Sequence, residues 1–251
     1  MRTALVQCAS SLDPGENRAH LASLVPAGAD LVVLPEAYAR DFGAPGSAVD
    51  EFAEPLDGPF VSALVAAAGD STVVAGMFEV SDDPARPYNT LVAVNRDGLV
   101  ASYRKIHLYD SFGNRESDRL SAGSVEQRPI FDLGDVRVAL ATCYDLRFPE
   151  LFRGLCVATD LVVLPAAWVA GPRKVRHWQT LLVARAIENV CYVAGAGQSP
   201  PRYSGHSMLV DPRGDVVASV TEDTGVALGE VDPDLVATAR RENPSLDNRR
   251  L

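Results

Sequence analysis

Short apolar runs bounded by turn residues recur along the chain and predict buried strands. These runs are Thr3–Gln7, Leu31–Leu34, Thr72–Phe78, Thr90–Val94, Val136–Ala141, Leu161–Leu164, Cys191–Ala196 and Ser207–Val210. Helical stretches alternate with them, at Asn17–Val25, Val61–Ala68, Glu150–Val157 and Arg176–Glu188. This alternation of strands and helices predicts an α/β fold.

The apolar runs also repeat, in the same order, in the two halves of the chain. The matching pairs are RTALVQC (2–8) with RVALATC (137–143), ADLVVLP (29–35) with TDLVVLP (159–165), VAG (74–76) with VAG (193–195), and the hairpin 91–102 with the segment 209–219. Any one match could reflect the shared valine and leucine content of buried strands. Four matches in series indicate two similar half-domains.

Two such half-domains would pack sheet on sheet and leave their helices outside, which gives a four-layer α-β-β-α sandwich with an internal pseudo-twofold repeat. We therefore predict one domain over residues 1–251, with half-repeats at about 1–105 and 136–230 and a C-terminal tail at about 233–251. Neither half need be stable alone.

Composition and charge narrow the function classes. The 251 residues are 47% hydrophobic and 22% charged, enough to bury an extensive core. The formal net charge is −10, and no block of five or six Lys and Arg residues could follow a phosphate backbone. Nucleic acid and anionic membrane are therefore excluded as expected partners.

The chain is expected to be soluble and cytoplasmic. Its first residues contain too short an apolar segment for a signal peptide, and Asp160 and Pro165 interrupt the longest apolar stretch, 154–172. The four cysteines, Cys8, Cys143, Cys156 and Cys191, show no CxxC spacing, and the four histidines lie far apart. This pattern is typical of reduced intracellular thiols, not of a disulfide framework or a metal site.

The two halves differ where chemistry is expected. After the two LVVLP segments the first half has Glu36 and the second has Ala166. A buried carboxylate costs several kcal/mol unless it is paired, and the carboxyl ends of strands are where α/β proteins build their sites. The alternative is a glutamate that faces solvent at the end of a strand.

Lys105 and Cys143 are the other residues that the comparison of halves singles out. Lys105 follows the first hairpin, where the second half has no lysine, although a lone lysine is usually a solvated surface charge. Cys143 closes a strand and precedes a polar turn and a helix, where peptide dipoles and a nearby lysine should lower a thiol pKa. A cysteine in an apolar strand is otherwise core filler, as we expect for Cys8, Cys156 and Cys191.

These three side chains suffice for acyl transfer. Glu36 could take the thiol proton and later activate water, and the ammonium group of Lys105 could stabilise the oxyanion of each tetrahedral intermediate.

At these residues the chain resembles the nitrilase, or carbon–nitrogen hydrolase, superfamily, in which Glu, Lys and Cys motifs occur in this order. The motifs here are LVVLPE36, YRK105IHLYD and ATC143YDLRFPE, and the similarity extends from Thr3 to about Asp232. The resemblance implies an α-β-β-α fold, a homodimer or higher homo-oligomer, and hydrolysis without a metal or organic cofactor. It also implies a second functional glutamate, Glu116, and an oxyanion hole completed by the backbone N–H of Tyr144.

The CYDLRFPE context is most similar to the branch that contains omega-amidase and deaminated-glutathione amidase. The expected substrate is a small amide that carries a carboxylate, although the short stretch after Lys105 departs from the omega-amidase pattern. Candidate pocket residues by nearness to the motifs are Tyr38, Arg147, Trp168 and Arg173. The alternatives are a nitrilase acting on small nitriles, a Cys/His hydrolase using His177 or His206, and a catalytically idle scaffold of the same fold.

Overall fold

The computed structural model describes residues 1–221 and 223–250, and in this part of the chain two six-stranded sheets dominate. The first sheet has the strand order β12-β1-β2-β3-β4-β5 and the second β11-β10-β9-β8-β7-β6. The strands of the first sheet are β1 Arg2–Gln7, β2 Leu31–Val33, β3 Thr72–Glu79, β4 Tyr88–Asn95, β5 Gly98–Arg104 and β12 Gly225–Glu230. Those of the second are β6 Ile130–Leu133, β7 Val136–Leu140, β8 Leu161–Ala166, β9 Tyr192–Gly197, β10 Met208–Val210 and β11 Val216–Ser219.

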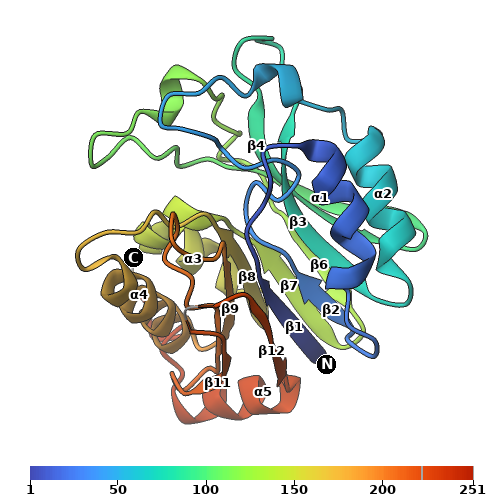
Figure 1. The fold of residues 1–251 in the computed structure, drawn as a ribbon. Helices are drawn as coiled ribbons and strands as arrows, with labels where there is room; N and C mark the ends of the chain where they lie inside the picture. Colours follow the sequence, from blue (N-terminus) through green and yellow to red (C-terminus); the bar gives the residue numbers. More distant parts are fainter. Residues whose placement is uncertain (222, 251) are drawn as a thin grey trace.

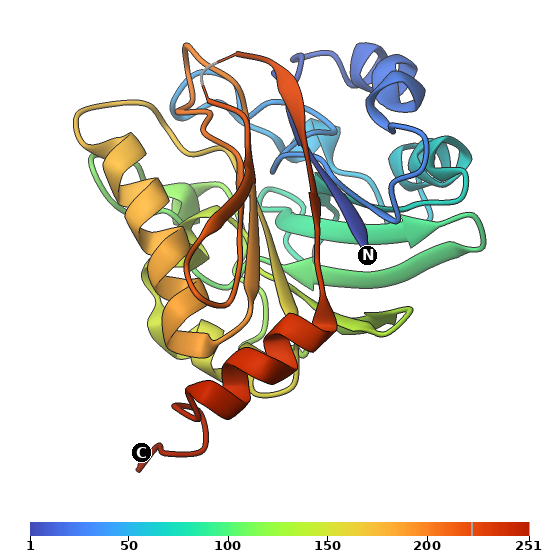
Figure 2. The same cartoon turned by 90° about the horizontal axis from the view of Figure 1, so that it is seen from below.

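Helices cover the outer faces of both sheets, as Figures 1 and 2 show. They are α1 Pro14–His20, α2 Pro59–Ala68, α3 Pro149–Cys156, α4 Lys174–Asn189 and α5 Pro233–Glu242. Helices α1 and α2 lie against the first sheet, and α3 and α4 lie against the second. The predicted α-β-β-α sandwich is confirmed.

Alternate residues of each strand face different layers, which explains the continuous apolar runs. In β1, Leu5 joins the core between the sheets, whereas Ala4 and Val6 join the core under α2. In β8, Val163 faces the first sheet and Val162 faces α4. Strands buried on both faces read as unbroken hydrophobic segments instead of alternating ones.

The internal repeat appears as matching topology. Strands β1, β2 and β3 are parallel neighbours, as are β7, β8 and β9, and antiparallel strands continue each sheet. Each sheet is completed on the other side by one antiparallel strand, β12 beside β1 and β6 beside β7. Since β12 comes from the C-terminal half of the chain, the first sheet needs both halves.

The segment expected to be a C-terminal tail contains helix α5. The Asp232 carboxylate accepts a hydrogen bond from the Asp234 N–H (2.9 Å) and caps the helix, and Pro233 occupies its first turn. Val236 is buried in the core between the sheets, and the Arg240 guanidinium donates to the carbonyl of Thr159. The tail therefore packs against the core between the sheets and is hydrogen-bonded to the second half.

A close approach of two segments in the first sheet fixes the backbone at Glu36. A Cβ atom at Gly76 in β3 would lie 2.3 Å from the Ala37 nitrogen and 2.8 Å from the Glu36 Cα. The Gly76 N–H donates to the Pro35 carbonyl and its carbonyl accepts from Ala39. Glycine is therefore required at this position so that the segment after β2 can lie against β3.

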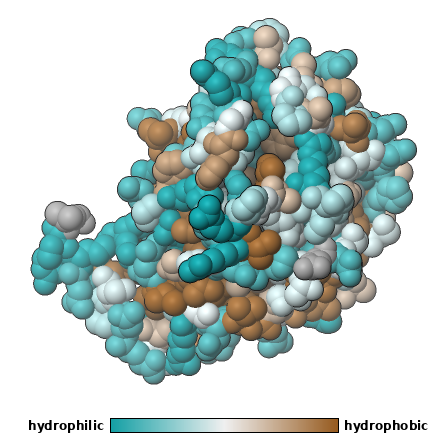
Figure 3. Space-filling view, turned by 60° about the vertical axis from the view of Figure 1, so that its left-hand side comes forward, coloured by the Kyte–Doolittle hydropathy of each residue, from teal (hydrophilic) through white to brown (hydrophobic). Residues whose placement is uncertain are grey.

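The surface on the α4 side has mixed character. Figure 3 shows hydrophilic residues over most of this face and hydrophobic residues gathered toward its lower part. Val157 and Ile187, after α3 and in α4, are about half exposed.

No helix within the described ranges is long and apolar enough to cross a bilayer.

Candidate active site

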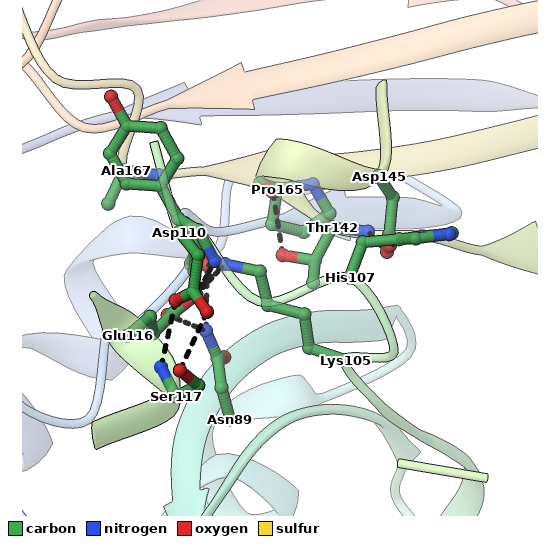
Figure 4. A network of polar contacts seen from close by, with 12 residues as sticks. Asn89, Lys105, His107, Asp110, Glu116, Ser117, Thr142, Asp145, Pro165 and Ala167 are labelled. Atoms are coloured by element: carbon green, nitrogen blue, oxygen red, sulfur yellow. Dashed lines mark hydrogen bonds and ion pairs between the residues drawn. The ribbon is translucent and has the colours of Figure 1, made fainter. Parts of the chain in front are cut away.

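Glu36, Lys105 and Cys143 follow β2, β5 and β7 and meet at one edge of the two sheets. Their side chains are almost completely buried, as is that of Glu116. The Lys105 Nζ lies 3.0 Å from Glu36 Oε1 and 2.9 Å from Glu116 Oε2, so one ammonium group bridges two carboxylates. Figure 4 shows Lys105 extending toward Glu116, with the Asn89 amide alongside. The lysine is thus a buried ion-pair partner and not a solvated surface charge.

Residues from both halves hold the Glu36 carboxylate. Its Oε1 accepts from the Asn89 side-chain amide in β4 (2.7 Å), and its Oε2 accepts from the backbone N–H of Ala167 (2.7 Å). Ala167 directly follows Ala166, which is the counterpart of Glu36 in the repeat. The second half therefore supplies a backbone N–H donor one residue after the position that corresponds to Glu36 in the first half.

Glu116 is positioned by the loop that follows Lys105. Its Oε2 accepts from the Tyr109 N–H at 2.6 Å. The loop is closed by Asp110, whose carboxylate accepts from the Ser117 N–H (3.0 Å) and hydroxyl (2.6 Å), as Figure 4 shows. These contacts fix the second carboxylate against the Lys105 ammonium.

Cys143 begins a short helical segment, Cys143–Arg147, with its backbone in the left-handed region at φ 46°. Such a conformation is uncommon for a residue other than glycine and is typical of sharp turns at functional sites. The turn is capped reciprocally, since Asp145 accepts from the Thr142 N–H (2.9 Å) and Thr142 accepts from the Asp145 backbone. The first N–H groups of a helical turn have no acceptor within the helix, which leaves the Tyr144 N–H available to a ligand.

A buried network behind this turn holds it in place. The Asp145 carboxylate also accepts from the Tyr103 hydroxyl (2.8 Å) and contacts His107 Nδ1 (2.7 Å). The His107 ring in turn stacks on Phe148, with ring centroids 3.7 Å apart. Asp145 therefore joins the end of β5 to the turn that carries the nucleophile.

The pKa of the Cys143 thiol is raised well above its usual value, which contradicts the expected lowering. Burial contributes most, followed by the charge of Glu36, and the opposing charge of Lys105 does not compensate for them. The sequence places a lysine near the thiol but does not reveal that burial and a carboxylate outweigh it. Cys143 therefore rests as a thiol beside the Glu36 carboxylate.

The pKa values of Glu36 and Lys105 favour their charged forms. Burial alone would raise the pKa of Glu36, but the charge of Lys105 and hydrogen bonds from Ala167 and Cys143 lower it. Burial would likewise lower the pKa of Lys105, but Glu116 and Glu36 raise it well above its usual value. At neutral pH Glu36 is therefore a carboxylate, Lys105 an ammonium group and Cys143 a thiol.

A cavity of about 690 Å³ opens above these groups. Glu36, Lys105, Glu116 and Cys143 line it together with Phe42, Arg119, Arg202 and Tyr203. A much smaller recess of about 20 Å³ also borders Cys143 and is lined by Tyr144, Arg147, Trp168 and Lys174. Within the described part of the chain, no group of three or more His, Cys, Asp or Glu residues could hold a metal ion.

A protein-family model described as carbon–nitrogen hydrolase matches residues 2–241, nearly the whole chain. This chain belongs to the carbon–nitrogen hydrolase family. A curated relative, the deaminated glutathione amidase of Escherichia coli O157:H7, is 40% identical over 224 residues, which cover 88% of this chain and 85% of the relative.

Solved structures of the family have the same fold. XC1258 from Xanthomonas campestris, a CN-hydrolase with an arsenic adduct in its active site, has a TM-score of 0.88 and 29% identity, covering 100% of this chain and 97% of that one. A mutant of the amidase from Nesterenkonia sp. AN1, with acrylamide added at its active-site cysteine, has a TM-score of 0.79 and 28% identity, covering 96% and 97%. This chain is accordingly a carbon–nitrogen hydrolase of the nitrilase superfamily, similar in fold to an amidase that carries an adduct at its active-site cysteine.

Two of the four predicted pocket residues line the site of this hydrolase. Arg147 and Trp168 line the small recess. Tyr38 does not reach either space, because its ring packs in the core beside Phe60 and its hydroxyl donates to the Asn17 carbonyl. Arg173 is exposed just before α4, and its neighbour Lys174 faces the recess instead.

The remaining thiols and histidines lie outside the lining of both spaces. Cys8 is buried, and burial raises the pKa of its thiol to about 12. Cys156, the last residue of α3, and Cys191 are buried in the core between the second sheet and its helices. His177 and His206 line neither space, so the Cys/His alternative finds no support in the geometry.

Sequence reasoning missed Asn89, Ala167, Asp145 and the three cavity arginines, Arg115, Arg119 and Arg202. A signal existed for Asp145, which occupies the third position of a helix-capping pattern that starts at Thr142. Ala167 acts through its backbone, and Asn89 lies in a strand whose register with Glu36 is visible only in three dimensions.

Proposed function

We propose that this enzyme hydrolyses the C–N bond of a small, carboxylate-bearing amide through a thioester on Cys143. The observation that carries the proposal is the buried cluster itself, in which Lys105 bridges two carboxylates beside a thiol at the floor of a cavity. Each group has the charge that one role in acyl transfer requires.

In the first half-reaction Glu36 takes the thiol proton as the Cys143 sulfur attacks the amide carbon. The Lys105 ammonium and the Tyr144 N–H stabilise the resulting oxyanion. The C–N bond then breaks, and the amine leaves with the proton returned by Glu36. Because the thiol pKa is raised, proton transfer to Glu36 accompanies the attack and does not precede it.

In the second half-reaction Glu36 takes a proton from water, whose oxygen attacks the thioester carbon. The C–S bond breaks, the sulfur recovers the proton from Glu36, and the acid is released. The balance is one amide and one water consumed, and one carboxylate and one protonated amine produced. Glu116 holds the Lys105 ammonium in place throughout.

We assign the carboxylate of the acyl group to the small recess, because two cations lie there. Arg147 Nε and Nη2 are buried there without hydrogen-bond partners, and the guanidinium lies 4.9 Å above the Trp168 ring centroid. Lys174 Nζ donates to the Tyr109 hydroxyl at 2.8 Å. Burial and the charge of Arg147 lower the pKa of Lys174. A bound anion would therefore form charge-assisted hydrogen bonds with both Arg147 and Lys174.

The similarity to deaminated glutathione amidases supports an amide substrate of this kind. The test is a panel of alpha-ketoglutaramate, succinamate, deaminated glutathione, neutral aliphatic amides and the matching nitriles. Ammonia release follows the primary amides and nitriles, and product chromatography follows deaminated glutathione. The carboxylate-bearing amides should be the fastest, and faster turnover of the nitriles would overturn the proposal.

Arg147→Gln tests the carboxylate assignment separately from the chemistry. It should raise KM for the carboxylate-bearing amides by about tenfold or more, in line with the loss of a charge-assisted hydrogen bond, and should change KM for neutral amides little. Arg176→Gln, on the exposed face of α4, is the matched control. Equal effects of Arg147→Gln on both amide classes would remove the recess as the carboxylate site.

A further inference from the structure

Two spaces of very different size meet at the nucleophile. The small recess and the large cavity share Tyr109, Cys143, Ala167 and Val169 as walls. If the recess takes the carboxylate of the acyl group, the large cavity is left for the group on the other side of the scissile bond. The inference that follows rests on this proposed orientation.

The large cavity exceeds what an ammonia leaving group needs. Cavities of about 300–1,000 Å³ enclose ligands of drug size, and this one measures about 690 Å³. Its wall combines apolar surface from Phe42, Pro45 and Val169 with several charged side chains. Such a space fits a leaving amine of several residues in length.

Three arginines line the cavity, and two of them are paired with carboxylates. Arg202 Nη1 lies 2.7 Å from Asp41 Oδ1, and Arg115 Nε lies 3.4 Å from Asp118 Oδ1. Arg119 forms no ion pair with any carboxylate in residues 1–221 or 223–250. Its Nη1 donates to the Ser47 carbonyl at 2.8 Å.

The surroundings of Arg119 favour an added negative charge. Its guanidinium lies 5.5 Å from the Phe42 ring centroid, on the cavity wall. The pKa of Arg119 is lowered mainly by burial. The charges of Arg202 and Arg40 lower it further, whereas the charge of Glu116 raises it. The Asp41 carboxylate is already paired with Arg202, so the guanidinium of Arg119 remains available to bind a negatively charged group of a ligand.

We propose that Arg119 binds a carboxylate on the leaving amine and selects N-substituted amides whose amine is an amino acid or a short peptide. The reaction remains hydrolysis of one C–N bond, with the acid and the protonated amino acid or peptide as products. Arg119 is then a specificity-determining residue, because it contacts the part of the substrate that is discarded.

The experiment compares three amides of one acyl group, chosen as the fastest in the substrate panel. Their leaving groups are ammonia, glycylglycine and glycylglycinamide, and the last two differ only by one negative charge. The wild-type enzyme should favour the glycylglycine amide over the glycylglycinamide amide by about tenfold or more in kcat/KM, the effect expected of one charge-assisted contact.

Arg119→Gln should reduce this ratio to within about twofold of unity, and Arg119→Lys should restore part of it because a lysine keeps the charge without the planar fork. Arg115→Gln, which removes an arginine of the same cavity that is already paired with Asp118, should preserve the ratio.

The outcomes separate this inference from the proposed function. If Arg119 only anchors the loop at Ser47, Arg119→Gln lowers kcat/KM for all three amides equally, and the unchanged ratio overturns the inference. A wild-type enzyme that hydrolyses all three at equal rates also overturns it while the thioester mechanism stands. Failure to hydrolyse any of the three, with no acyl group on Cys143, would instead contradict the proposed function.

Discussion

Removal of the Lys105 ammonium should destabilise the fold strongly, because it leaves two buried carboxylates without their cation. Glu36 and Glu116 lie 3.0 and 2.9 Å from Nζ, and all three side chains are at most 5% exposed. Breaking a buried ion pair on one side costs about 3–5 kcal/mol. For a chain of this size each kcal/mol lowers Tm by about 2–4 °C, so Lys105→Met should lower Tm by roughly 6–20 °C at pH 7.5.

The deficit should also depend on pH with a definite sign. In the wild-type protein Lys105 lowers the pKa of Glu36, so the stability that this pair contributes is present above the unfolded pKa and is lost as pH falls through the folded one. In Lys105→Met burial would instead dominate and raise the pKa of Glu36. A carboxyl group with a raised folded pKa binds its proton more tightly in the folded state, so the deficit should shrink as pH falls toward 5.5.

Urea unfolding followed by circular dichroism at pH 7.5 and 5.5 measures both effects. The double variant Lys105→Met/Glu116→Gln should recover part of the loss, because it removes one of the two unpaired charges. Lys174→Met is the control, since Lys174 forms no ion pair within the described chain and bonds to a tyrosine hydroxyl. A deficit below about 1 kcal/mol, the range of a surface ion pair, or a deficit equal at both pH values, would refute the reasoning.

Four further predictions follow from the site and the fold. Cys143→Ala should abolish amide hydrolysis without lowering Tm by more than a few degrees, whereas Cys8→Ala should retain most activity; selective alkylation of Cys8 that stops turnover would contradict this. Glu36→Gln should lower kcat at least about a hundredfold, as expected when a general acid–base group is removed, and near-normal turnover would exclude its role as base. Gly76→Ala should lower both activity and Tm, because its Cβ would lie 2.3 Å from the Ala37 nitrogen; unchanged kinetics would mean that the Glu36 backbone need not be held there. Light scattering at micromolar concentration should give at least twice the 26.8 kDa chain mass, and a monomer would contradict the expected homo-oligomer.

Much of the fold was predictable from the sequence, because strands buried on both faces leave unbroken apolar runs. Strands β6 and β12 were missed for the opposite reason. Both lie at the edges of their sheets, have mixed burial and carry little hydrophobic signal. Helix α5 was missed because only Val236 and Ala239 of its ten residues are buried.

The three central site residues were predictable because the internal repeat supplies its own reference and because their motifs resemble those of the nitrilase superfamily. Glu36 differs from its counterpart Ala166, and Cys143 differs from its counterpart Cys8 in the polar turn and helix that follow it. Neither difference requires any knowledge of distances. The direction of the thiol pKa was not predictable, because it depends on how deeply Cys143 is buried and on how strongly Glu36 and Lys105 each act on it.

The sequence also does not reveal which arginine is available to bind substrate. Arg119, Arg173 and Arg202 look alike in the sequence, and only the pairing of Arg202 with Asp41 and the exposure of Arg173 distinguish them. Sequence spacing predicts which residues come near the site, whereas ion pairing decides which of them remain available.

The most direct test of the thioester mechanism is mass spectrometry of enzyme quenched with acid during turnover of the fastest amide. The thioester predicts that a peptide containing Cys143 gains the mass of the acyl group less one hydrogen, and that Cys143→Ala shows no such adduct. Glu36→Gln should form it more slowly in the first turnover, because attack on the amide and departure of the amine both require the carboxylate. Turnover with an acyl group on Cys8, Cys156 or Cys191, or hydrolysis by Cys143→Ala at the wild-type rate, would contradict the mechanism.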